Sequence, residues 1–540
     1  MILSVAPDGT GDFTTIQAAV DAAPEGGNAP VIIRVRLGEY HEKLHITKDN
    51  LRIVGDVAER TVLTNSDSAL QKLPDGTEKG TFLSYTMLIT GRDVTIENLT
   101  IRNDAGDGRE VGQAVALYAA GDRGTFRRCR LIAHQDTLFC GPIMPKVAEH
   151  ALPYRLPVTC ESVGDAPLTS ARQYFEDCTI GGDVDFIFGP YRCWFERCTL
   201  ICNNRDMDIN GYYTAANTPE AQPHGFVFHN CHLTGENCAD QTVYLGRPWR
   251  AFSRTVFLGC TMDACVHPEG WADWAEKPVT WRYAEHGTLP ARDDLTLRHP
   301  GASRLSDAEA ASLTIAAVLG GADNWQPDRP PRALFIAGDS TACDYPADRY
   351  PRAGWGQALP PLLPGMPIYN EAASGRSSKS FVAERRLLDI EHCLRPGDLF
   401  LIQFGHNDEK DDVARATDAH TTFPAYLAMY INAARARGAV PILLTPIVRR
   451  RFANGALVDT HGEYPKAVRA LAAERGVQLI DLEALTRAAV QALGEERSKE
   501  WFLHVEAGHR NYPDGEADDS HLRYDGAHAV AGMVVGALAP

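Results

Sequence analysis

A repeated pattern of hydrophobic positions dominates residues 120–265. Each copy holds a phenylalanine, a cysteine three residues later and an aliphatic residue or methionine two residues after the cysteine. The last three intervals between these cysteines are 20, 33 and 29 residues, the scale of one solenoid turn with loops of variable length. The pattern predicts short strands stacked as a parallel β-helix, built on five copies: Phe126/Cys129/Leu131, Phe175/Cys178/Ile180, Phe195/Cys198/Leu200, Phe228/Cys231/Leu233 and Phe257/Cys260/Met262.

Apolar segments before the repeat supply the first coils of the predicted β-helix. Residues 51–54, 94–96 and 99–101 are rich in β-branched and aliphatic side chains, as strands are. Residues 14–23 instead place Ile16 and Val20 one helical turn apart, which indicates an amphipathic helix. Such a helix would cover the open edge of the first coil, which could otherwise pair with another chain.

The pattern changes after residues 323–332, which hold three prolines and no apolar periodicity. We expect this segment to link a first domain, residues 1–322, to a second, residues 333–540. In the second domain apolar runs at 334–337, 399–404, 440–444 and 477–482 alternate with helical stretches that include 464–475 and 482–493. This alternation predicts a parallel sheet flanked by helices.

Composition and charge narrow the classes of partner. Hydrophobic residues make up 44% and charged residues 23% of the 540 residues, as in globular proteins, and no apolar run approaches the roughly 20 residues that span a bilayer. The formal net charge of −17 disfavours nucleic acid and anionic lipid, because both bind cationic surfaces. We therefore expect neither a nucleic-acid nor a membrane partner.

The cysteines and the N-terminal residues bear on compartment and metal binding. There are 13 cysteines, an odd number, and several occupy the repeated core position, which favours reduced buried thiols over disulfides. Cys193, Cys198 and Cys202 are close in sequence, but their spacing matches no zinc pattern, so no metal site is expected. The N-terminal residues contain no signal-peptide pattern, which favours a cytoplasmic location. A secreted protein trimmed of its signal would look the same.

Three segments of the first domain carry candidate chemistry: His-Gln-Asp-Thr-Leu at 134–138, Gly-Asp-Val-Asp-Phe-Ile-Phe-Gly at 182–189 and Tyr-Leu-Gly-Arg-Pro-Trp at 244–249. The domain has no serine in a recognisable nucleophile setting, so carboxylates must act. In this order the segments resemble the pectin methylesterase family over most of residues 1–320. The resemblance implies an all-β, right-handed parallel β-helix with Asp185 as nucleophile, Asp136 as general acid and base, and Arg247 as the partner of Asp185. It also implies oxyanion-binding amides and aromatic residues along the sugar cleft: Gln113 and Gln135, and Phe139, Phe186 and Trp249.

Two features depart from the family pattern. His134 stands where the family often has a small residue, and it is either part of the substrate site or a structural histidine. Residues 141–170 contain five prolines and directly follow the segment that holds Asp136. We predict that this stretch forms a wall or lid over the cleft; the alternative is a solvated insertion without substrate contact.

Polar segments follow the apolar runs of the second domain. Gly-Asp-Ser-Thr at 338–341 comes directly after one run, and Gly-His-Asn-Asp at 405–408 comes after the next. Open parallel sheets bind ligands beyond the carboxyl ends of their strands, so Ser340 stands where a nucleophile is expected. A third polar segment covers 370–376, and Asp-Asp-Ser-His lies at 518–521.

These four segments in this order resemble the SGNH (GDSL-type) hydrolases, especially the rhamnogalacturonan acetylesterase branch. The resemblance implies an α/β, three-layer, flavodoxin-like domain with a triad of Ser340, His521 and Asp518. It assigns oxyanion donors to the backbone N–H groups of Ser340 and Gly375 and to the Asn407 amide.

Two nearby residues compete for the triad roles. Asp519 has the wrong spacing to His521, and His528 falls inside an alanine-rich closing helix, so neither is preferred. Residues 354–357 and 445–449 strengthen the match to acetylesterases over lipases, and no exposed apolar lid is evident.

Two ester-hydrolysing sets on one chain predict a bifunctional pectin de-esterase. It would remove methyl groups from galacturonate carboxyls and acetyl groups from sugar hydroxyls, on a methylated and acetylated pectic oligosaccharide or polysaccharide and without a cofactor. One alternative is an inactive, carbohydrate-binding β-helix joined to a single active acetylesterase; another is an acyl thioesterase or lipase-type esterase. The sequence does not decide the substrate length, the acetylated position, the order of the two steps or the oligomeric state.

Overall fold

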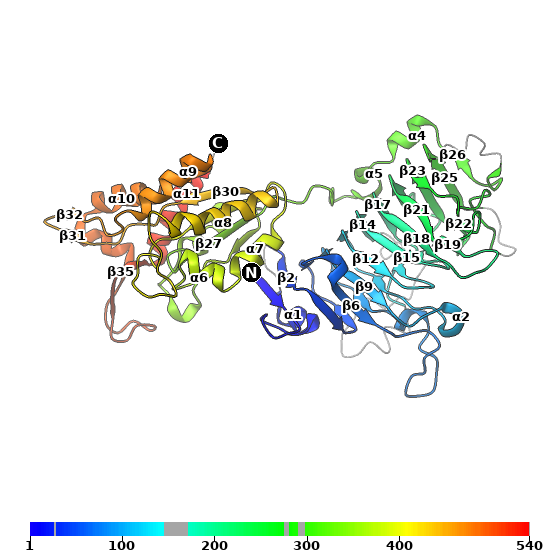
Figure 1. Ribbon diagram of the computed structural model, residues 1–540, viewed down its shortest axis with the longest axis horizontal. Coiled ribbons are helices and arrows are strands. Elements are labelled where there is room, and N and C mark those ends of the chain that lie inside the picture. The colour runs from blue at the N-terminus through cyan, green and yellow to red at the C-terminus, as the bar shows by residue number, and fades with distance from the viewer. Residues whose placement is uncertain (26–28, 145–170, 275–279, 290–296, 539–540) are drawn as a thin grey trace. The chain divides into compact units, whose positions relative to one another are not determined.

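The computed structural model describes residues 1–25, 29–144, 171–274, 280–289 and 297–538. These residues form two compact units: Leu3–Pro330, and Pro331–Pro540 together with Met1–Ile2. The first unit, coloured blue to green, consists mainly of short strands, whereas the second, coloured from light green to red, alternates strands and helices (Figure 1). The division falls inside residues 323–332, the segment predicted to be a linker.

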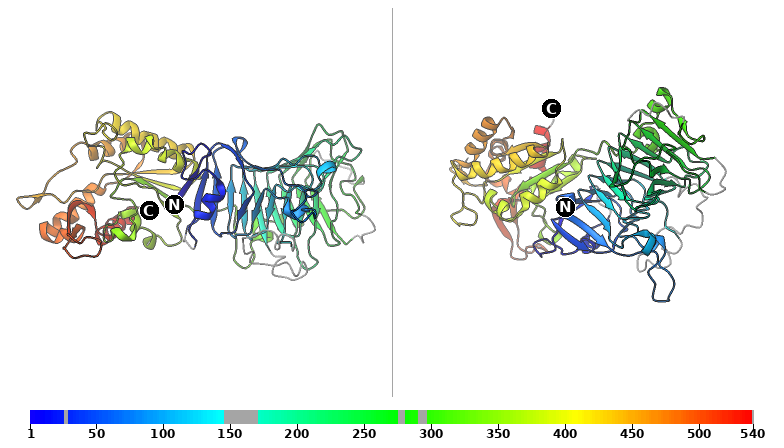
Figure 2. Two further views of the ribbon diagram at one scale, coloured as in Figure 1. Left: turned by 90° about the horizontal axis from the view of Figure 1, so that it is seen from below. Right: turned by 45° about the vertical axis from the view of Figure 1, so that its right-hand side comes forward.

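The first unit is a parallel β-helix made of three sheets, and its coils stack on one another (Figure 2). Each full coil contributes a strand to each sheet in turn. Sheet A contains β1 (Ile2–Val5), β2 (Val31–Val35), β5 (Leu51–Gly55), β8 (Thr95–Glu97), β11 (Gly124–Arg127), β14 (Arg172–Glu176), β17 (Arg192–Glu196), β20 (Phe226–His229), β23 (Arg254–Leu258), β25 (Arg282–His286) and β26 (Ser303–Arg304). Sheet B contains β3 (Gly38–His41), β6 (Thr61–Asn65), β9 (Thr100–Asn103), β12 (Arg130–Ile132), β15 (Thr179–Gly182), β18 (Thr199–Asn203), β21 (His232–Glu236) and β24 (Thr261–Met262). Sheet C contains β4 (Leu44–Ile46), β7 (Met87–Ile89), β10 (Leu117–Ala119), β13 (Leu138–Cys140), β16 (Ile187–Gly189), β19 (Gly211–Ala216) and β22 (Val243–Gly246).

The repeated phenylalanines form a stack inside the β-helix, which confirms the predicted architecture. The five rings lie in register on paired strands of sheet A, and successive centroids are 4.6, 4.7, 4.3 and 4.7 Å apart. This matches the spacing of about 4.7–4.9 Å between hydrogen-bonded strands. The repeated cysteines are buried free thiols. Each of the last four donates to the carbonyl of the phenylalanine one coil earlier, at 3.4 to 3.7 Å.

The predicted N-terminal helix covers the first coil. Helix α1 (Ile16–Ala22) begins at Thr15, whose side chain accepts the backbone N–H of Ala18, and it buries Ile16 and Val20. The Glu42 carboxylate accepts two further N–H groups of the first turn, at 2.7 and 2.9 Å. These contacts satisfy donors that a helix start otherwise leaves unpaired.

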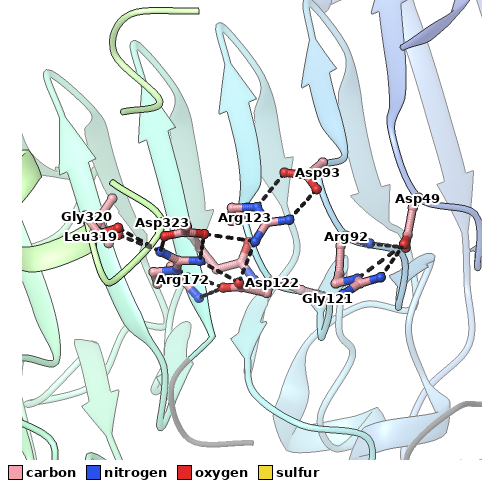
Figure 3. Close-up of polar contacts among 11 residues, drawn as sticks. Asp49, Arg92, Asp93, Gly121, Asp122, Arg123, Arg172, Leu319, Gly320 and Asp323 are labelled. Carbon is pink, nitrogen blue, oxygen red and sulfur yellow. Dashed lines mark hydrogen bonds and ion pairs between the residues drawn. The ribbon is translucent and has the colours of Figure 1, made fainter. Parts of the chain in front are cut away.

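Arginine–aspartate pairs connect successive coils at the turns that lead into sheet A (Figure 3). Arg123 binds Asp93 in the preceding coil at 2.6 and 2.5 Å. Arg172 binds Asp122 in the same way and also holds Asp323 at 2.6 and 2.8 Å. Asp323, the first residue of the predicted linker, is therefore anchored on the β-helix. Further helices of this unit are α2 (Gly108–Val111), α4 (Asp307–Ser312) and α5 (Ile315–Leu319).

The second unit has a five-stranded parallel sheet in the order β28-β27-β29-β30-β33, as a flavodoxin-like fold requires. Its strands are β27 (Leu334–Gly338), β28 (Ile368–Asn370), β29 (Leu399–Gln403), β30 (Val440–Leu444) and β33 (Gln478–Ile480). Two small antiparallel pairs are β31 (Phe452–Ala453) with β32 (Ala456–Leu457) and β34 (Phe502–Val505) with β35 (Glu516–Leu522). The edge strand β28 was not predicted, because three residues show too little periodicity.

Helices cover both faces of this sheet and give the predicted three layers. Side chains such as Leu334 and Ile442 pack with α10 (Leu482–Arg497) and α11 (Tyr524–Leu538) on one face. Phe400 contacts Tyr430 of α8 (Thr422–Ala436) on the other. The remaining helices are α6 (Ser378–Ala383), α7 (Arg386–Cys393) and α9 (Tyr464–Arg475). Alternate strand residues thus serve two cores, as in parallel sheets buried on both faces.

Candidate active sites

Turns between sheets B and C bring the predicted residues of the first unit together in successive coils. Gln113 lies just before β10, Gln135 and Asp136 before β13, and Asp185 before β16. The Asp136 N–H donates to the Val184 carbonyl at 3.1 Å, which joins two of these turns directly. Asp136 and Asp185 both have positive φ angles, 67° and 54°, a conformation that aspartate tolerates better than most residues and that allows a sharp bend.

Arg247, which directly follows β22, holds the Asp185 carboxylate with two parallel hydrogen bonds. Nε is 2.8 Å from Oδ1 and Nη2 is 2.7 Å from Oδ2. The guanidinium lies 4.1 Å from the ring centres of both Tyr212 and Trp274. These rings fix the plane of the arginine, and the bidentate pair fixes the carboxylate. Tyr212 and Trp274 were not predicted, because neither has a spacing in the sequence that relates it to Arg247.

Asp136 has a different environment from Asp185. Its side chain is buried, and burial raises its pKa well above the ordinary value. The negative charges of Asp185 and Asp183 raise the pKa further, while the charge of Arg247 and a hydrogen bond from Gln135 oppose the rise. Asp185 thus accepts two strong hydrogen bonds from Arg247, whereas Asp136 favours the protonated form. Such a pair can divide the roles of nucleophile and acid.

An aromatic cluster lies on the outer face of sheet C beside these residues. The Phe139 ring centre is 4.7 Å from that of Phe188 and 6.5 Å from that of Trp249. Phe139 is buried within the cluster, whereas Trp249 is partly exposed. The structure therefore places two of the three predicted aromatic residues together, next to the turns that carry Asp136 and Asp185.

The assignment of Phe186 to the sugar cleft is wrong. Its side chain is 0% exposed and belongs to the interior core of the β-helix, where it contacts Tyr213. Phe188 occupies the outer cluster instead. The turn at Asp185 interrupts strand alternation, so counting along Phe-Ile-Phe did not reveal which ring faces outward.

Two further predictions concern the surroundings of the catalytic turns. His134 Nδ1 lies 3.2 Å from a carboxylate oxygen of Asp183, and its side chain is partly exposed. The predicted wall or lid, residues 141–170, lies almost entirely outside the described residues and stays a prediction.

The second unit brings its predicted triad into hydrogen-bond contact. Ser340 lies two residues after the end of β27, the strand between β28 and β29 in the parallel sheet. Its Oγ is 3.0 Å from His521 Nε2, and His521 Nδ1 is 2.6 Å from Asp518 Oδ2. Burial alone would raise the pKa of Asp518, but the hydrogen bond and charge of His521 and two backbone N–H donors lower it well below its usual range.

The predicted oxyanion donors belong to loops that follow β27, β28 and β29. Gly375 has a φ of 80°, and a side chain there would meet no atom within 4 Å. The space next to its backbone is therefore open. Asn407 is buried, and its amide nitrogen donates one hydrogen to the Arg376 carbonyl at 3.0 Å. That contact orients the amide and leaves the nitrogen a second hydrogen to donate.

The competing residues have other contacts. Asp519 binds Arg450 and His504, each at 2.7 Å. His528 lies in α11, where its ring is 6.4 Å from that of Tyr524. The structure therefore joins His521 to Asp518 and to neither competitor.

The described residues contain neither a candidate metal cluster nor a helix suited to a bilayer. No cluster of three or more His, Cys, Asp or Glu side chains there could hold a metal ion. In the same residues, no helix combines the length and apolarity needed to cross a bilayer.

Comparisons with known proteins match each unit separately. The Pectinesterase family model matches residues 2–142 and 162–322, and the GDSL-like Lipase/Acylhydrolase family model matches residues 336–529. Pectin methylesterase from carrot aligns with a TM-score of 0.50 and 28% identity, covering 61% of this chain and 96% of the carrot chain.

Two curated relatives show the same division. The probable pectinesterase/pectinesterase inhibitor 23 of Arabidopsis thaliana is 34% identical over 338 residues, 60% of this chain. This chain spans about half, 53%, of that relative's length. Rhamnogalacturonan acetylesterase RhgT of Bacillus subtilis (strain 168) is 44% identical over 209 residues, which cover 38% of this chain and 89% of the relative. The chain therefore belongs to the pectinesterase family and carries a second unit that belongs with the GDSL-like acylhydrolases.

Proposed function

We propose that this chain removes two kinds of ester from pectic substrates. The β-helix unit would hydrolyse methyl esters of galacturonate, and the α/β unit would hydrolyse acetyl esters on sugar hydroxyls. The observation that carries the proposal is that one chain brings together two sets of side chains suited to ester hydrolysis: Asp185, Asp136 and Arg247 in one unit, and Ser340, His521 and Asp518 in the other. The pectinesterase and rhamnogalacturonan acetylesterase relatives support the substrate class.

In the β-helix unit, Asp185 would attack the carbonyl carbon of the methyl ester. Arg247 orients its two oxygens, and the amides of Gln113 and Gln135 would donate to the oxygen that gains negative charge. Asp136, whose raised pKa favours the acid form, would transfer its proton to the departing methanol. The same group, now a carboxylate, would take a proton from the water that hydrolyses the acyl–aspartate, which regenerates both side chains.

In the α/β unit, Ser340 Oγ would attack the acetyl carbonyl while His521 Nε2 takes its proton, across the 3.0 Å contact. Asp518 holds the other ring nitrogen and stabilises the imidazolium. The backbone N–H of Gly375 and the Asn407 amide would donate to the oxyanion. His521 would then protonate the leaving sugar oxygen. A water that gives a proton to the same ring would attack the acetyl–serine, which releases acetate and restores the Ser340 hydroxyl.

Two single variants and one substrate test this proposal. Methanol and acetate are measured from the same methylated, acetylated pectic oligosaccharide with Asp185→Asn and Ser340→Ala. Asp185→Asn should reduce methanol release by about four to six decades and leave acetate release unchanged, while Ser340→Ala should do the reverse. An inactive, binding-only β-helix would release no methanol even as wild type. An acyl esterase would prefer p-nitrophenyl esters of long acids to the pectic substrate.

A further inference from the structure

A polar groove lies beside the catalytic turn that carries Asp136. Its volume is about 480 Å³, and it is lined by the C-terminal ends of sheet-B strands and the residues after them. Its lining contains no Phe, Tyr or Trp. Asparagine is the most frequent lining residue, and its amide suits hydroxyl and carboxylate groups rather than an apolar ligand. The lining includes Asn103, His134, Asn203, Asn204 and Asn237.

His134 connects this groove to the catalytic aspartates. It is two residues before Asp136, and two residues of extended chain span at most about 7 Å. Its ion-pair partner Asp183 is two residues before Asp185 and only 1% exposed, whereas the His134 side chain is 39% exposed. The pair therefore joins Asp183, a buried residue close to Asp185, to His134, a partly exposed residue on the wall of the groove.

The hydrogen-bond pattern gives the His134 ring a defined orientation and charge. Nδ1 faces Asp183, so Nε2, on the opposite side of the ring, is directed away from it. No hydrogen bond within the described ranges engages Nε2. The hydrogen bond and charge of Asp183 raise the pKa of His134, against the effect of burial, and Asp107 adds to the rise. His134 can thus present an imidazolium N–H while Asp183 holds the other nitrogen.

The other charges around His134 are mostly paired with one another. Arg109 binds Asp107 at 2.5 Å, and Arg102 binds Asp104 at 2.7 Å. Glu236 is an exposed acid among the lining residues. His134 therefore has one ring donor that no described residue engages, and an anion at Nε2 would complete the pair of contacts that the ring can make.

We propose that His134 determines specificity by binding the free carboxylate of a galacturonate unit next to the ester being hydrolysed. The proposal rests on the methylesterase function proposed for this unit, because hydrolysis of one ester creates such a carboxylate on the polymer. The groove would hold the adjoining sugars through the amides of Asn204 and Asn237, since the Asn103 amide nitrogen donates to three backbone carbonyls. The unit would therefore prefer chains that already carry free carboxylates beside the remaining methyl esters.

A pair of substrates and a matched control test this role. The ratio of kcat/KM for methanol release is measured on half-esterified against fully methyl-esterified hexagalacturonate. Wild type should favour the half-esterified substrate by about tenfold, and His134→Gln should bring the kcat/KM ratio close to one. His134→Lys restores a cation and should recover part of the wild-type ratio. His232→Gln is the control, because His232 also binds an aspartate, Asp263 at 3.0 Å, with a side chain 45% exposed on sheet B, but does not line the groove.

Each outcome separates the two proposals. If wild type releases no methanol from either substrate, the methylesterase function fails. If wild type is active but shows no preference, or if His134→Gln lowers both rates equally and keeps the ratio, His134 is a structural residue and the specificity role is wrong. Inhibition by unmethylated trigalacturonate gives a second measurement, since it should weaken about tenfold in His134→Gln and stay unchanged in His232→Gln.

Discussion

The contact between Arg247 and Asp185 allows a quantitative prediction for the conservative variant Arg247→Lys. Lysine keeps the positive charge but cannot make two parallel hydrogen bonds at 2.8 and 2.7 Å. Losing one charge-assisted hydrogen bond costs about 1.5–3 kcal/mol. The flat guanidinium also loses its place between Tyr212 and Trp274, both 4.1 Å away.

If most of this loss appears in the transition state, kcat for methanol release should fall about 10- to 100-fold, since 1.36 kcal/mol corresponds to a factor of ten. The control is Arg197→Lys, because Arg197 also binds a carboxylate twice, Asp177 at 2.9 and 3.2 Å, on an exposed part of the β-helix. That variant should release methanol at the wild-type rate, and both variants should release acetate normally. Methanol release by Arg247→Lys within twofold of wild type would show that charge alone, without bidentate geometry, is sufficient.

Three further predictions concern Asp518, Asp136 and the phenylalanine stack. Asp518→Asn should lower kcat/KM for acetate release by about three to four decades, because the imidazole loses the partner that sets its tautomer; methanol release should not change. Methanol release should decline as the pH rises through the raised pKa of Asp136, because the proton donor is lost, while acetate release, which uses an unprotonated imidazole, should persist in the same buffers. Phe195→Ala, at a side chain that is 0% exposed between rings 4.7 and 4.3 Å away, should destabilise the β-helix unit by about 3–5 kcal/mol in chemical denaturation. A loss below 1 kcal/mol would mean that the stack repacks around the cavity.

The β-helix could be predicted because its register repeats the same side chains. Parallel in-register pairing places Phe126, Phe175 and their successors over one another, so the structural period appears directly in the sequence. Where no repeat existed, prediction was weaker. The three-residue strand β28 and the anchoring of Asp323 by Arg172 depend on residues far apart in the chain, which no local pattern reports.

The same distinction applies to the candidate sites. Asp136, Asp185 and Arg247, like Ser340 and His521, lie in short motifs at strand ends, and the structure brings each set together. The error at Phe186 arose where a positive-φ turn at Asp185 changes which side of the strand faces the core. Tertiary neighbours of the motifs, such as Trp274 over Arg247, became visible only in the folded chain.

Burial raises the pKa of the aspartate in both candidate sites, but the neighbouring groups differ. Burial and neighbouring negative charge raise the pKa of Asp136, so this group favours the folded state at low pH and that contribution is lost as the pH rises through its folded pKa. Asp518 is also partly buried, but His521 and backbone donors lower its pKa, so its contribution is present above the ordinary aspartate pKa and lost as the pH falls through the folded value. An acid that must give a proton therefore has few donors around it, and a base-orienting carboxylate has several. We therefore expect the donors around each carboxylate, more than its burial, to decide which of the two aspartates is protonated.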